Sequence, residues 1–265
     1  MKISVLMGIY NCADTLPAAI DCLLAQTYPH WELILCEDGS ADNTYQVAEG
    51  YRQRYPDKIV LLKNEKNMGL NYTLNRCLSA ATGELIARMD GDDLCMPDRF
   101  EKELQALEEN PDMAVVSTPM EYFDDSGTWG TGKAIERPQP RDLLYGTPFC
   151  HAPCLARREA IQAVGGYTDD KKFLRVEDYD LWVKLYAAGY RGMNLTQPLY
   201  RMRDDRNAAS RRKFKYRINE TRVKWKAVRL LKLPVWGYVY ALRPILVGLL
   251  PMGLYTRLHK KRLEK

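Results

Sequence analysis

The first hundred residues alternate short apolar runs with stretches whose apolar residues repeat at helical spacing, and this alternation constrains the fold most strongly. Continuously apolar strands of this length, separated by helices, are typical of a parallel sheet that helices cover on both faces. The sequence therefore predicts an α/β fold. The predicted strands are Ile3–Ile9, Trp31–Cys36, Ile59–Leu62 and Leu85–Met89, and the predicted helices are Thr15–Leu24, Asn43–Tyr55 and Asn71–Ala81.

Polar residues follow each predicted strand at the point where the strand ends. In open parallel sheets, ligands bind beyond the carboxyl ends of the strands. We therefore expect the polar residues of all four strands to meet at one edge of the sheet and to form a ligand site there. They are Tyr10 and Asn11, Glu37 and Asp38, Asn67 to Gly69, and Asp90 to Asp93.

Three carboxylates, those of Asp90, Asp92 and Asp93, stand within four residues directly after the fourth strand. Carboxylates this close raise one another's pKa, so that a compensating positive charge is needed. A few carboxylates at a strand end suit Mg²⁺ or Mn²⁺ that is shared with the phosphates of a substrate. The alternative is an acidic turn in solvent, in which Asp92 or Asp93 caps the next helix. The residues alone leave both interpretations open.

Two other acidic positions have an ordinary interpretation and a functional one. Asp38 precedes Gly39 in a common turn dipeptide, yet its place at the ligand edge also suits a hydrogen bond to a base or a ribose. Glu177 and Asp178 open the predicted helix Tyr179–Ala188, where negative charge is favourable at the helix N-terminus. A carboxylate there also suits a general base that takes a proton from a hydroxyl. Spacing alone favours the helix-terminal interpretation.

The pattern after residue 100 is less regular. Residues Asp124 to Pro140 are rich in turn formers and predict a loop. The sequence contains neither a GxxxxGK[ST] loop nor a GxGxxG motif after the first strand, which excludes the common nucleotide-binding fingerprints. The other predicted elements are a helix over Arg99–Glu109, a strand over Met113–Pro119 and a helix over Glu159–Val164.

Charge is divided unevenly along the chain. Residues 200–265 contain 19 Lys and Arg and 4 Asp and Glu, whereas residues 1–199 contain 20 and 30. A basic tail on an acidic body indicates contact with something anionic, either nucleic acid or a lipid surface. Nucleic acid is a poor partner here, because the edge predicted to face the ligand is acidic.

The tail is also apolar and aromatic from Leu233 onward, but Arg243, Pro244 and Pro251 interrupt it. These breaks argue against a membrane span. The sequence predicts that residues 211–265 form a basic, amphipathic helical region at an anionic membrane surface. The alternative is a helical pair that packs on the domain or in a homo-oligomer interface.

Seven cysteines are present, an odd number with irregular spacing and no CxxC pair, which favours a reducing compartment. The first residues, MKISVLMGIYN, are too short and too soon polar for a signal peptide. Together with the basic tail, these features predict a cytoplasmic protein, peripheral at the inner face of the cell membrane.

The motifs, taken in order, resemble those of family 2 glycosyltransferases. The resemblance covers most of residues 2–200 and implies the GT-A fold, a Rossmann-like, mostly parallel sheet with helices on both faces. It also implies a catalytic domain over residues 1–210, with a nucleotide-binding half over 1–100 and an acceptor-side half over 101–210. The matching segments are SVLMGIYNCADTLPAAIDCLLAQTYPHWELILCEDGSADNT, NEKNMGLNYTLNRCLSAATGELIARMDGDDLCMPDRF, HAPCLARREAIQAVGGYTDD and RVEDYDLWVKLYAAG.

The resemblance implies a nucleotide-sugar donor, with UDP-sugar expected. Tyr10 and Asp38 would hold the base, and Asp92 would lie on the ribose side. Asn67 and Gly69, at the same edge of the sheet, are further candidates for donor binding. The QxxRW motif of processive polysaccharide synthases is absent, which favours the addition of one sugar.

The resemblance also implies an inverting reaction that depends on Mn²⁺ or Mg²⁺. Asp93 would be the principal metal ligand with Asp90 nearby, and Asp178 would be the catalytic base. Many relatives carry a short loop with a His after the position of residue 200, where this chain reads RMRDDRNAASRR. Arg203 or Arg206 would then clamp the diphosphate in place of that loop. The alternative is a basic loop in solvent.

The expected acceptor is a glycan or a lipid-linked glycan in polysaccharide biosynthesis. Two alternatives to this function remain at the level of sequence. One is a sugar-nucleotide pyrophosphorylase, which can share the nucleotide-binding half. The other is a membrane-associated protein that binds sugar nucleotides without catalysis, and the intact Glu177–Asp178 pair argues against it.

Overall fold

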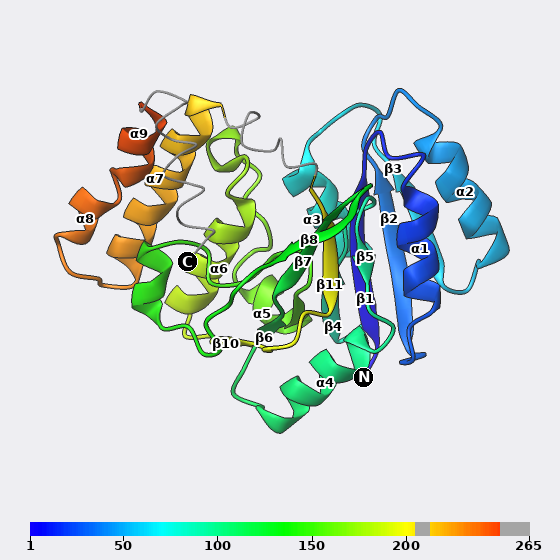
Figure 1. Ribbon diagram of the computed structural model, residues 1–265, viewed down its shortest axis with the longest axis horizontal. Helices are drawn as coiled ribbons and strands as arrows, with labels where there is room; N and C mark the ends of the chain where they lie inside the picture. The colour runs from blue at the N-terminus through cyan, green and yellow to red at the C-terminus, as the bar shows by residue number, and fades with distance from the viewer. Residues whose placement is uncertain (205–212, 250–265) are drawn as a thin grey trace.

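The computed structural model of the protein describes residues 1–204 and 213–249. In this part of the chain, a central sheet contains seven strands (Figure 1). All its neighbouring strands run parallel except β9, which is antiparallel to both of its neighbours. The strand order is β10 (Gly192–Asn194), β6 (Val115–Ser117), β9 (Leu155–Arg157), β4 (Leu85–Arg88), β1 (Ile3–Ile9), β2 (Trp31–Glu37) and β3 (Ile59–Lys63).

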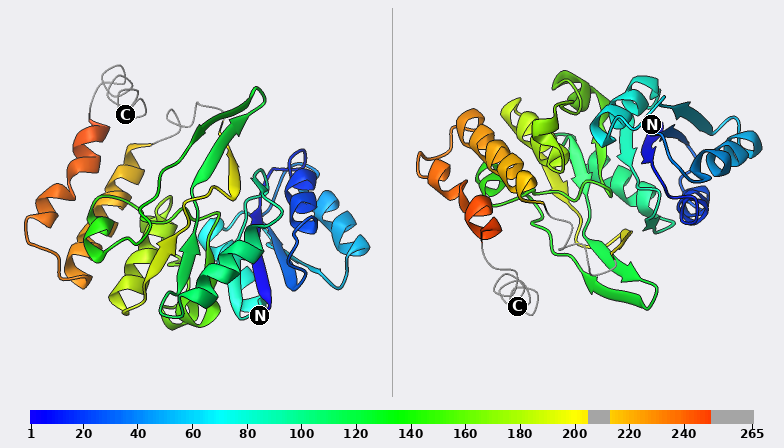
Figure 2. Two further views of the ribbon diagram at one scale, coloured as in Figure 1. Left: turned by 60° about the horizontal axis from the view of Figure 1, so that its bottom comes forward. Right: turned by 90° about the horizontal axis from the view of Figure 1, so that it is seen from above.

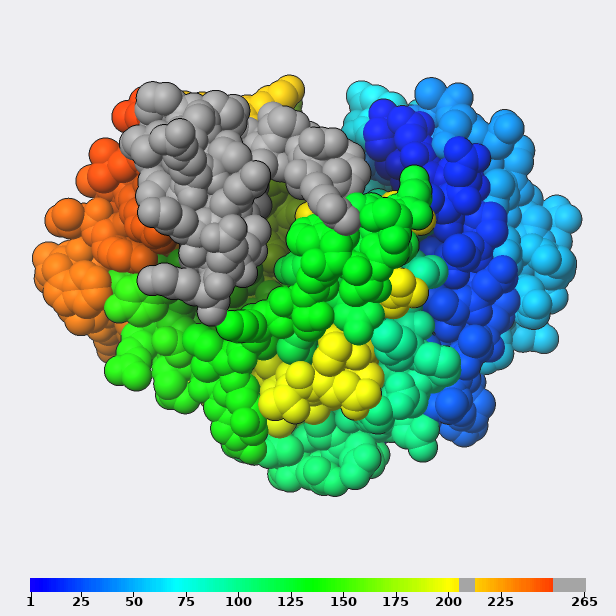
Figure 3. Space-filling model, viewed as in Figure 1, coloured from blue at the N-terminus to red at the C-terminus, as the bar shows by residue number. Residues whose placement is uncertain are grey.

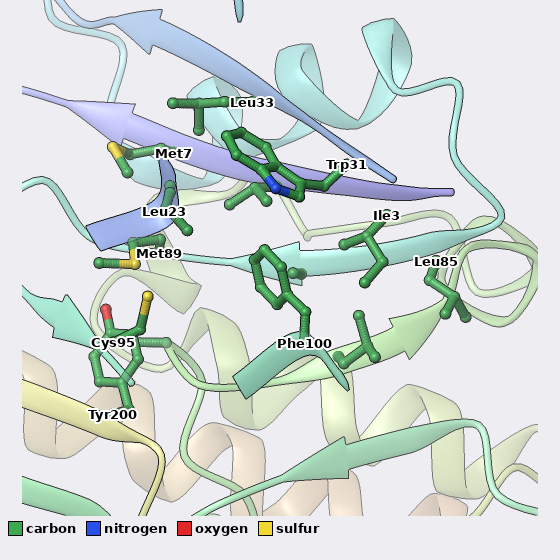
Figure 4. Close-up of a cluster of buried hydrophobic side chains, with 14 of the residues drawn as sticks. Ile3, Met7, Leu23, Trp31, Leu33, Leu85, Met89, Cys95, Phe100 and Tyr200 are labelled. Carbon is green, nitrogen blue, oxygen red and sulfur yellow. The ribbon is translucent and has the colours of Figure 1, made fainter. Parts of the chain in front are cut away.

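Helices cover both faces of this sheet, so the predicted α/β fold is confirmed. Side chains alternate along β1, because successive residues of a strand point to opposite faces. Ile3 and Met7 pack in one core cluster, which Figure 4 shows together with Phe100, and Leu6 packs in the other cluster. The first cluster includes α1 (Leu16–Leu24), α2 (Thr44–Arg54) and α4 (Arg99–Glu109), and the second includes α3 (Leu70–Ala80), α5 (Arg158–Ala163) and α6 (Glu177–Ala187).

The structure confirms the strands and helices predicted for the first hundred residues one by one. All four strands and all three helices predicted there are present, and their ends differ from the predicted ends by at most one residue. The strands β1, β2 and β4 are buried along almost their whole length, whereas only Ile59 is buried in the edge strand β3. Because both faces of a central strand are covered, its sequence is continuously apolar, and this makes it easy to recognise.

A second, smaller sheet lies beside the carboxyl ends of the main strands. Its order is β5 (Leu94–Cys95), β11 (Tyr200–Arg203), β7 (Met120–Asp124) and β8 (Gly127–Thr131). The prediction that residues 124–140 form only a loop is therefore wrong. The turn formers after Asp124 make the tip of a β7–β8 hairpin, where Gly127 has a φ of 112°, and β8 returns antiparallel to β7. This hairpin projects from the body of the protein (Figure 2).

The described part of the C-terminal region is helical. It contains α7 (Phe214–Leu230), α8 (Gly237–Tyr240) and α9 (Arg243–Gly248). Helix α7 is fixed to the domain, because Lys226 Nζ lies 2.5 Å from the buried Asp180 Oδ1 and Asn219 Nδ2 donates to the Leu174 carbonyl at 3.1 Å. Within residues 1–204 and 213–249, no helix is long and apolar enough to cross a membrane. The rest of the predicted tail, from residue 250, lies outside the described residues.

A buried ion pair within α4 anchors this helix to the main sheet through one of its members, Arg99. Arg99 and Glu103 are both fully buried, and the Arg99 Nε donates to both Glu103 oxygens at 3.2 Å. The rest of the guanidinium donates to three backbone carbonyls, those of Arg88, Ala152 and Cys154. Burial nevertheless raises the pKa of Glu103 to about 7, because desolvation outweighs the attraction of Arg99.

We expect Arg99→Met to destabilise the protein by about 3–5 kcal/mol, because it leaves a buried carboxyl without its partner and removes the guanidinium hydrogen bonds to three backbone carbonyls. Urea unfolding followed by fluorescence measures this change. Glu108→Gln, at an exposed position of the same helix, is the matched control and should change stability by no more than about 0.5 kcal/mol. Equal unfolding midpoints for the two variants would show that the pair is dispensable.

Candidate active site

Asp38 holds the loop that leads into α3. Its buried carboxylate accepts hydrogen bonds from Asn64 Nδ2 at 2.7 Å, from the Met68 backbone N–H at 2.8 Å and from the Gly69 backbone N–H at 2.9 Å. Gly39 follows with a φ of +73°, and a Cβ on it would lie 2.6 Å from the Asn67 backbone nitrogen. The close approach of these two loops therefore requires glycine at this position.

A cleft of about 240 Å³ opens between this loop and the segment before α6. Four of the residues predicted to bind the donor line it together, which confirms that they are neighbours. They are Tyr10, Asp38, Asn67 and Gly69. The opposite wall comes from the second half of the chain, through Leu174, Arg175, Glu177 and Tyr216.

Two buried acceptor atoms in the cleft have no hydrogen-bond partner among the described residues. They are Asn71 Oδ1 and Glu177 Oε2. The amide nitrogen of Asn71 does have a partner, since Nδ2 donates to the Thr168 carbonyl at 2.7 Å. Leaving a buried acceptor unpaired costs about 1–3 kcal/mol, so a ligand with hydroxyl or N–H donors would be stabilised here.

The acidic cluster after β4 is only partly compensated by the protein. Arg88, itself buried, binds Asp90 with two parallel hydrogen bonds of 2.6 and 2.9 Å. Asp92 is exposed. Asp93 is buried and accepts hydrogen bonds from the Tyr200 hydroxyl at 2.9 Å and from the Arg203 backbone N–H at 2.8 Å.

These contacts leave Asp93 without a compensating positive charge. Burial, followed by the neighbouring carboxylates of Asp90 and Asp92, raises its pKa to about 8, in spite of the two hydrogen bonds. This shift indicates a place where one further positive charge would be stabilising.

A divalent cation fits here because it would supply the missing positive charge. Within residues 1–204 and 213–249, no group of three or more His, Cys, Asp or Glu is arranged to hold a metal by itself. A Mg²⁺-type site does not need such a group, because one or two carboxylates bind the ion and the phosphates of the substrate supply further ligands. Asp93, with Asp90 or Asp92, fits this second kind of site.

Arg203 takes part in the site through its backbone rather than through its guanidinium. Its side chain binds Asp125 Oδ1 at 2.8 Å, near the tip of the β7–β8 hairpin, and lies 4.9 Å from the centre of the Phe123 ring. Its predicted contact with the diphosphate stays a prediction. Arg206, the other arginine considered for that contact, lies outside the described residues.

Asp178 is the second residue of α6 and is half-buried. Burial, followed by the charge of Glu177, raises its pKa to about 6, although the Tyr179 backbone N–H and the Arg88 charge act in the opposite direction. An acidic residue whose only role is to favour the helix N-terminus would have a lowered pKa. Asp178 therefore has the character of a proton acceptor near neutral pH.

Three functional candidates were not identified from the sequence: Arg88, Asn71 and Glu177 as a cleft residue. Arg88 ends an apolar strand, and the sequence does not show to which side of the sheet its side chain points. Asn71 had one available indication, because it directly follows the polar cluster that ends at Gly69. The sequence marks Glu177 only as the neighbour of Asp178, and its place in the cleft depends on the tertiary structure.

Known proteins match this chain along most of its length. The family model for glycosyl transferase family 2 matches residues 4–165, and the model for glycosyl transferase family group 2 matches residues 85–258. The chain is 43% identical over 261 residues to EpsE of Bacillus subtilis (strain 168), described as a glycosyltransferase, with 98% of this chain and 94% of EpsE covered.

A second relative and a solved structure agree with this match. The chain is 31% identical over 274 residues to the Escherichia coli UDP-Gal:alpha-D-GlcNAc-diphosphoundecaprenol beta-1,3-galactosyltransferase, with 100% and 97% of the two chains covered. Its fold is similar to that of the mannosyltransferase PcManGT from Pyrobaculum calidifontis, solved with GDP-Man and Mn²⁺. That similarity has a TM-score of 0.68 at 19% identity and covers 98% of this chain and 79% of that chain. The chain belongs to glycosyltransferase family 2 and has the GT-A fold, as its sequence motifs predicted.

Proposed function

We propose that the enzyme transfers a single sugar from a UDP-sugar to a lipid-linked glycan, with inversion and with the help of Mn²⁺ or Mg²⁺. The observation that carries this proposal is that the cleft and the candidate general base adjoin at the start of α6. Glu177 lines the cleft, and the next residue, Asp178, has a pKa of about 6. The residue that lines the proposed donor cleft and the residue able to accept a proton are therefore adjacent in the chain.

The donor is held in the cleft by residues from both walls. Tyr10 and Asp38 bind the base, with Asn67 and Gly69 from the loop that Asp38 orders, and Asp92 lies on the ribose side. The unpaired acceptors of the cleft bind hydroxyl or N–H groups of the donor, which removes the cost of leaving them buried and empty. The choice of UDP is supported by the UDP-Gal named for the Escherichia coli relative.

The chemical step requires one protein base. Asp178 accepts the proton of the acceptor hydroxyl as the oxygen attacks the anomeric carbon from the side opposite the diphosphate, so one displacement inverts the configuration. Asp93, with Asp90 nearby, would hold a divalent cation, which would supply positive charge to the diphosphate as it leaves. The Mn²⁺ in the PcManGT structure supports the choice of ion. Arg203, the last residue of β11, would contact the diphosphate once its side chain leaves Asp125.

The acceptor is a lipid-linked intermediate of polysaccharide biosynthesis at the cytoplasmic face of the membrane. The diphosphoundecaprenol acceptor in the name of the Escherichia coli relative supports this choice. An acceptor fixed in a membrane requires the enzyme to work at the membrane surface, and the basic C-terminal region is the part of the chain suited to it.

A thermal-shift panel tests donor binding directly. With UDP and Mn²⁺ in large excess over the dissociation constant, we expect the unfolding midpoint to rise by about 5 °C or more, because the ligand binds only the folded state. GDP, CDP and dTDP should give smaller shifts, and a chelator should remove the UDP shift.

Asn71→Ala connects this result to the cleft. It should weaken the shift, whereas Gln53→Ala, at an exposed position of α2, should leave it unchanged. No shift with any nucleotide in the parent protein would contradict the proposed donor site. A shift without product formation on any lipid-linked acceptor would instead favour a sugar-nucleotide-binding protein without catalysis.

A further inference from the structure

An apolar stripe runs along the outside of α8 and α9. Its five members recur at intervals of four, three, four and three residues, which places them on one face of a helix. They are Val235 (82% exposed), Val239 (72%), Leu242 (36%), Leu246 (63%) and Leu249 (67%). Trp236, next to the first member, is 54% exposed.

The stripe is continuous because the backbone between the two short helices stays helical. Leu242 N–H donates to the Val239 carbonyl at 3.1 Å and Leu246 N–H donates to the Leu242 carbonyl at 3.2 Å. At the helical rise per residue, the stripe is about 21 Å long.

The other face of α8 and α9 is already occupied by α7. A Cβ on Gly237 would lie 2.9 Å from Val228 Cγ2, and a Cβ on Gly248 would lie 3.1 Å from Phe214 Cδ2. Ala241 is fully buried. The stripe is therefore the outward face of a helix pair whose inward face is packed. This helix pair lies at the end of the molecule away from α2 (Figure 3).

The surroundings of the stripe are strongly basic. Residues 213–249 contain nine Lys and Arg and a single acidic residue, Glu220, a formal charge of +8. Glu220 forms ion pairs with Arg217 and Lys224. The side chains of Arg229, Lys232 and Arg243 are exposed, and none of them forms an ion pair within the described residues.

Charge decides which partner suits this surface. A second copy of the chain, packed stripe against stripe, would bring two strongly basic regions together, and like charges repel. An anionic bilayer instead offers an apolar layer for the stripe and negative headgroups for the cations beside it. Trp236 suits the boundary between these layers, since an indole ring has an apolar body and a polar N–H.

We propose that the stripe inserts into the headgroup region of an anionic membrane, with Arg229, Lys232 and Arg243 contacting the lipid headgroups. This inference rests on the proposed function in one respect: membrane docking would bring the enzyme to its lipid-linked acceptor. Tyr216, in the first turn of α7, lines the donor cleft, and the same helix carries α8 and α9. One rigid helix thus connects the membrane contact to the donor site.

Flotation of the full chain with vesicles tests this docking. The vesicles contain phosphatidylcholine with about one phosphatidylglycerol in three, and no acceptor lipid, so the measurement does not depend on transfer. The double variant Val239→Asp, Leu246→Asp should bind at least about tenfold more weakly, because each carboxylate would have to enter the headgroup region. The control Val60→Asp, Ile135→Asp, which places the same charges at exposed apolar positions elsewhere, should bind like the parent protein.

A second variant tests the electrostatic part of the docking. Arg229→Glu, Lys232→Glu should bind the anionic vesicles no better than the parent protein binds vesicles of phosphatidylcholine alone. Each variant should keep the unfolding midpoint and the UDP shift of the parent, since all four positions are exposed and lie outside the cleft. That result separates loss of docking from loss of the donor site.

Three outcomes would overturn the proposal. The parent protein does not float with anionic vesicles. The Val239→Asp, Leu246→Asp variant floats as well as its control. The parent protein is a dimer by light scattering, and that variant is a monomer whose vesicle binding is unchanged, in which case the stripe is a contact between two copies.

Discussion

Replacing Asp178 by Asn is expected to lower the rate of sugar transfer by about 10²–10⁴-fold, the usual contribution of a positioned general base. The amide keeps the shape of the side chain but cannot accept the proton of the attacking hydroxyl. Donor binding should persist, because the cleft is lined by Glu177 and not by Asp178. The thermal shift with UDP and Mn²⁺ should therefore equal that of the parent protein.

The pH dependence of the parent enzyme provides an independent check. Because the pKa of Asp178 is about 6, its basic form predominates above that pH, and the transfer rate should fall about tenfold per unit below it. The Asn variant should lack this fall.

Stability should change in the opposite sense. A carboxyl whose pKa is raised by folding binds its proton more tightly in the folded state, so its ionisation costs stability as the pH rises through 6. At pH 7 the Asn variant should be at least as stable as the parent protein, and thermal melts at pH 5 and pH 7 measure the difference.

Asp169→Asn is the matched control, because Asp169 is exposed and lies in the same segment. It should leave rate, pH profile and melting point unchanged. Should Asp178→Asn turn over at the parent rate with an intact donor shift, another group is the base and the proposed role of Asp178 is wrong.

Replacing Asp93 by Asn is expected to abolish the part of donor binding that depends on Mn²⁺. The buried carboxyl of Asp93 lacks a compensating positive charge and is the proposed ligand of the cation, and a neutral amide removes that ligand. Transfer should fall by about 10²–10³-fold, because metal neutralisation of a leaving group contributes several kcal/mol. The UDP shift should become as small as it is with chelator in the parent protein.

The same change should stabilise the protein without ligands. Burial and the carboxylates of Asp90 and Asp92 disfavour ionised Asp93, so the parent protein gives up stability as the pH rises through about 8. The amide removes that cost, and its oxygen can still accept from the Arg203 N–H. Melting curves at pH 6 and pH 9 should therefore differ less for the variant than for the parent protein.

Asp112→Asn, which removes an exposed carboxylate outside the cluster, is the control for charge alone and should change neither the UDP shift nor the transfer rate. A chelator-sensitive UDP shift that survives in Asp93→Asn would show that the cation is held elsewhere. Loss of the shift together with a lower melting point would instead indicate a structural role for Asp93.

The sequence by itself determined the parts of this protein that depend on local patterns. Strands that are buried on both faces are continuously apolar, and the intervening helices repeat at 3.6 residues, so the first hundred residues could be read element by element. The polar residues at the strand ends, from Tyr10 to Asp93, could be assigned to one edge because parallel strands all end there. The order of the motifs was sufficient to place the chain in its family.

Tertiary structure decided the chemistry of the individual side chains. Asp93 receives its hydrogen bonds from Tyr200 and Arg203, which are 107 and 110 positions away, and no local pattern records such a contact. Asn71 and Glu177, each with an unpaired acceptor, line one cleft only because two halves of the chain form it. A pKa depends on burial and on neighbouring charges in space, and both exist only once distant segments have packed together.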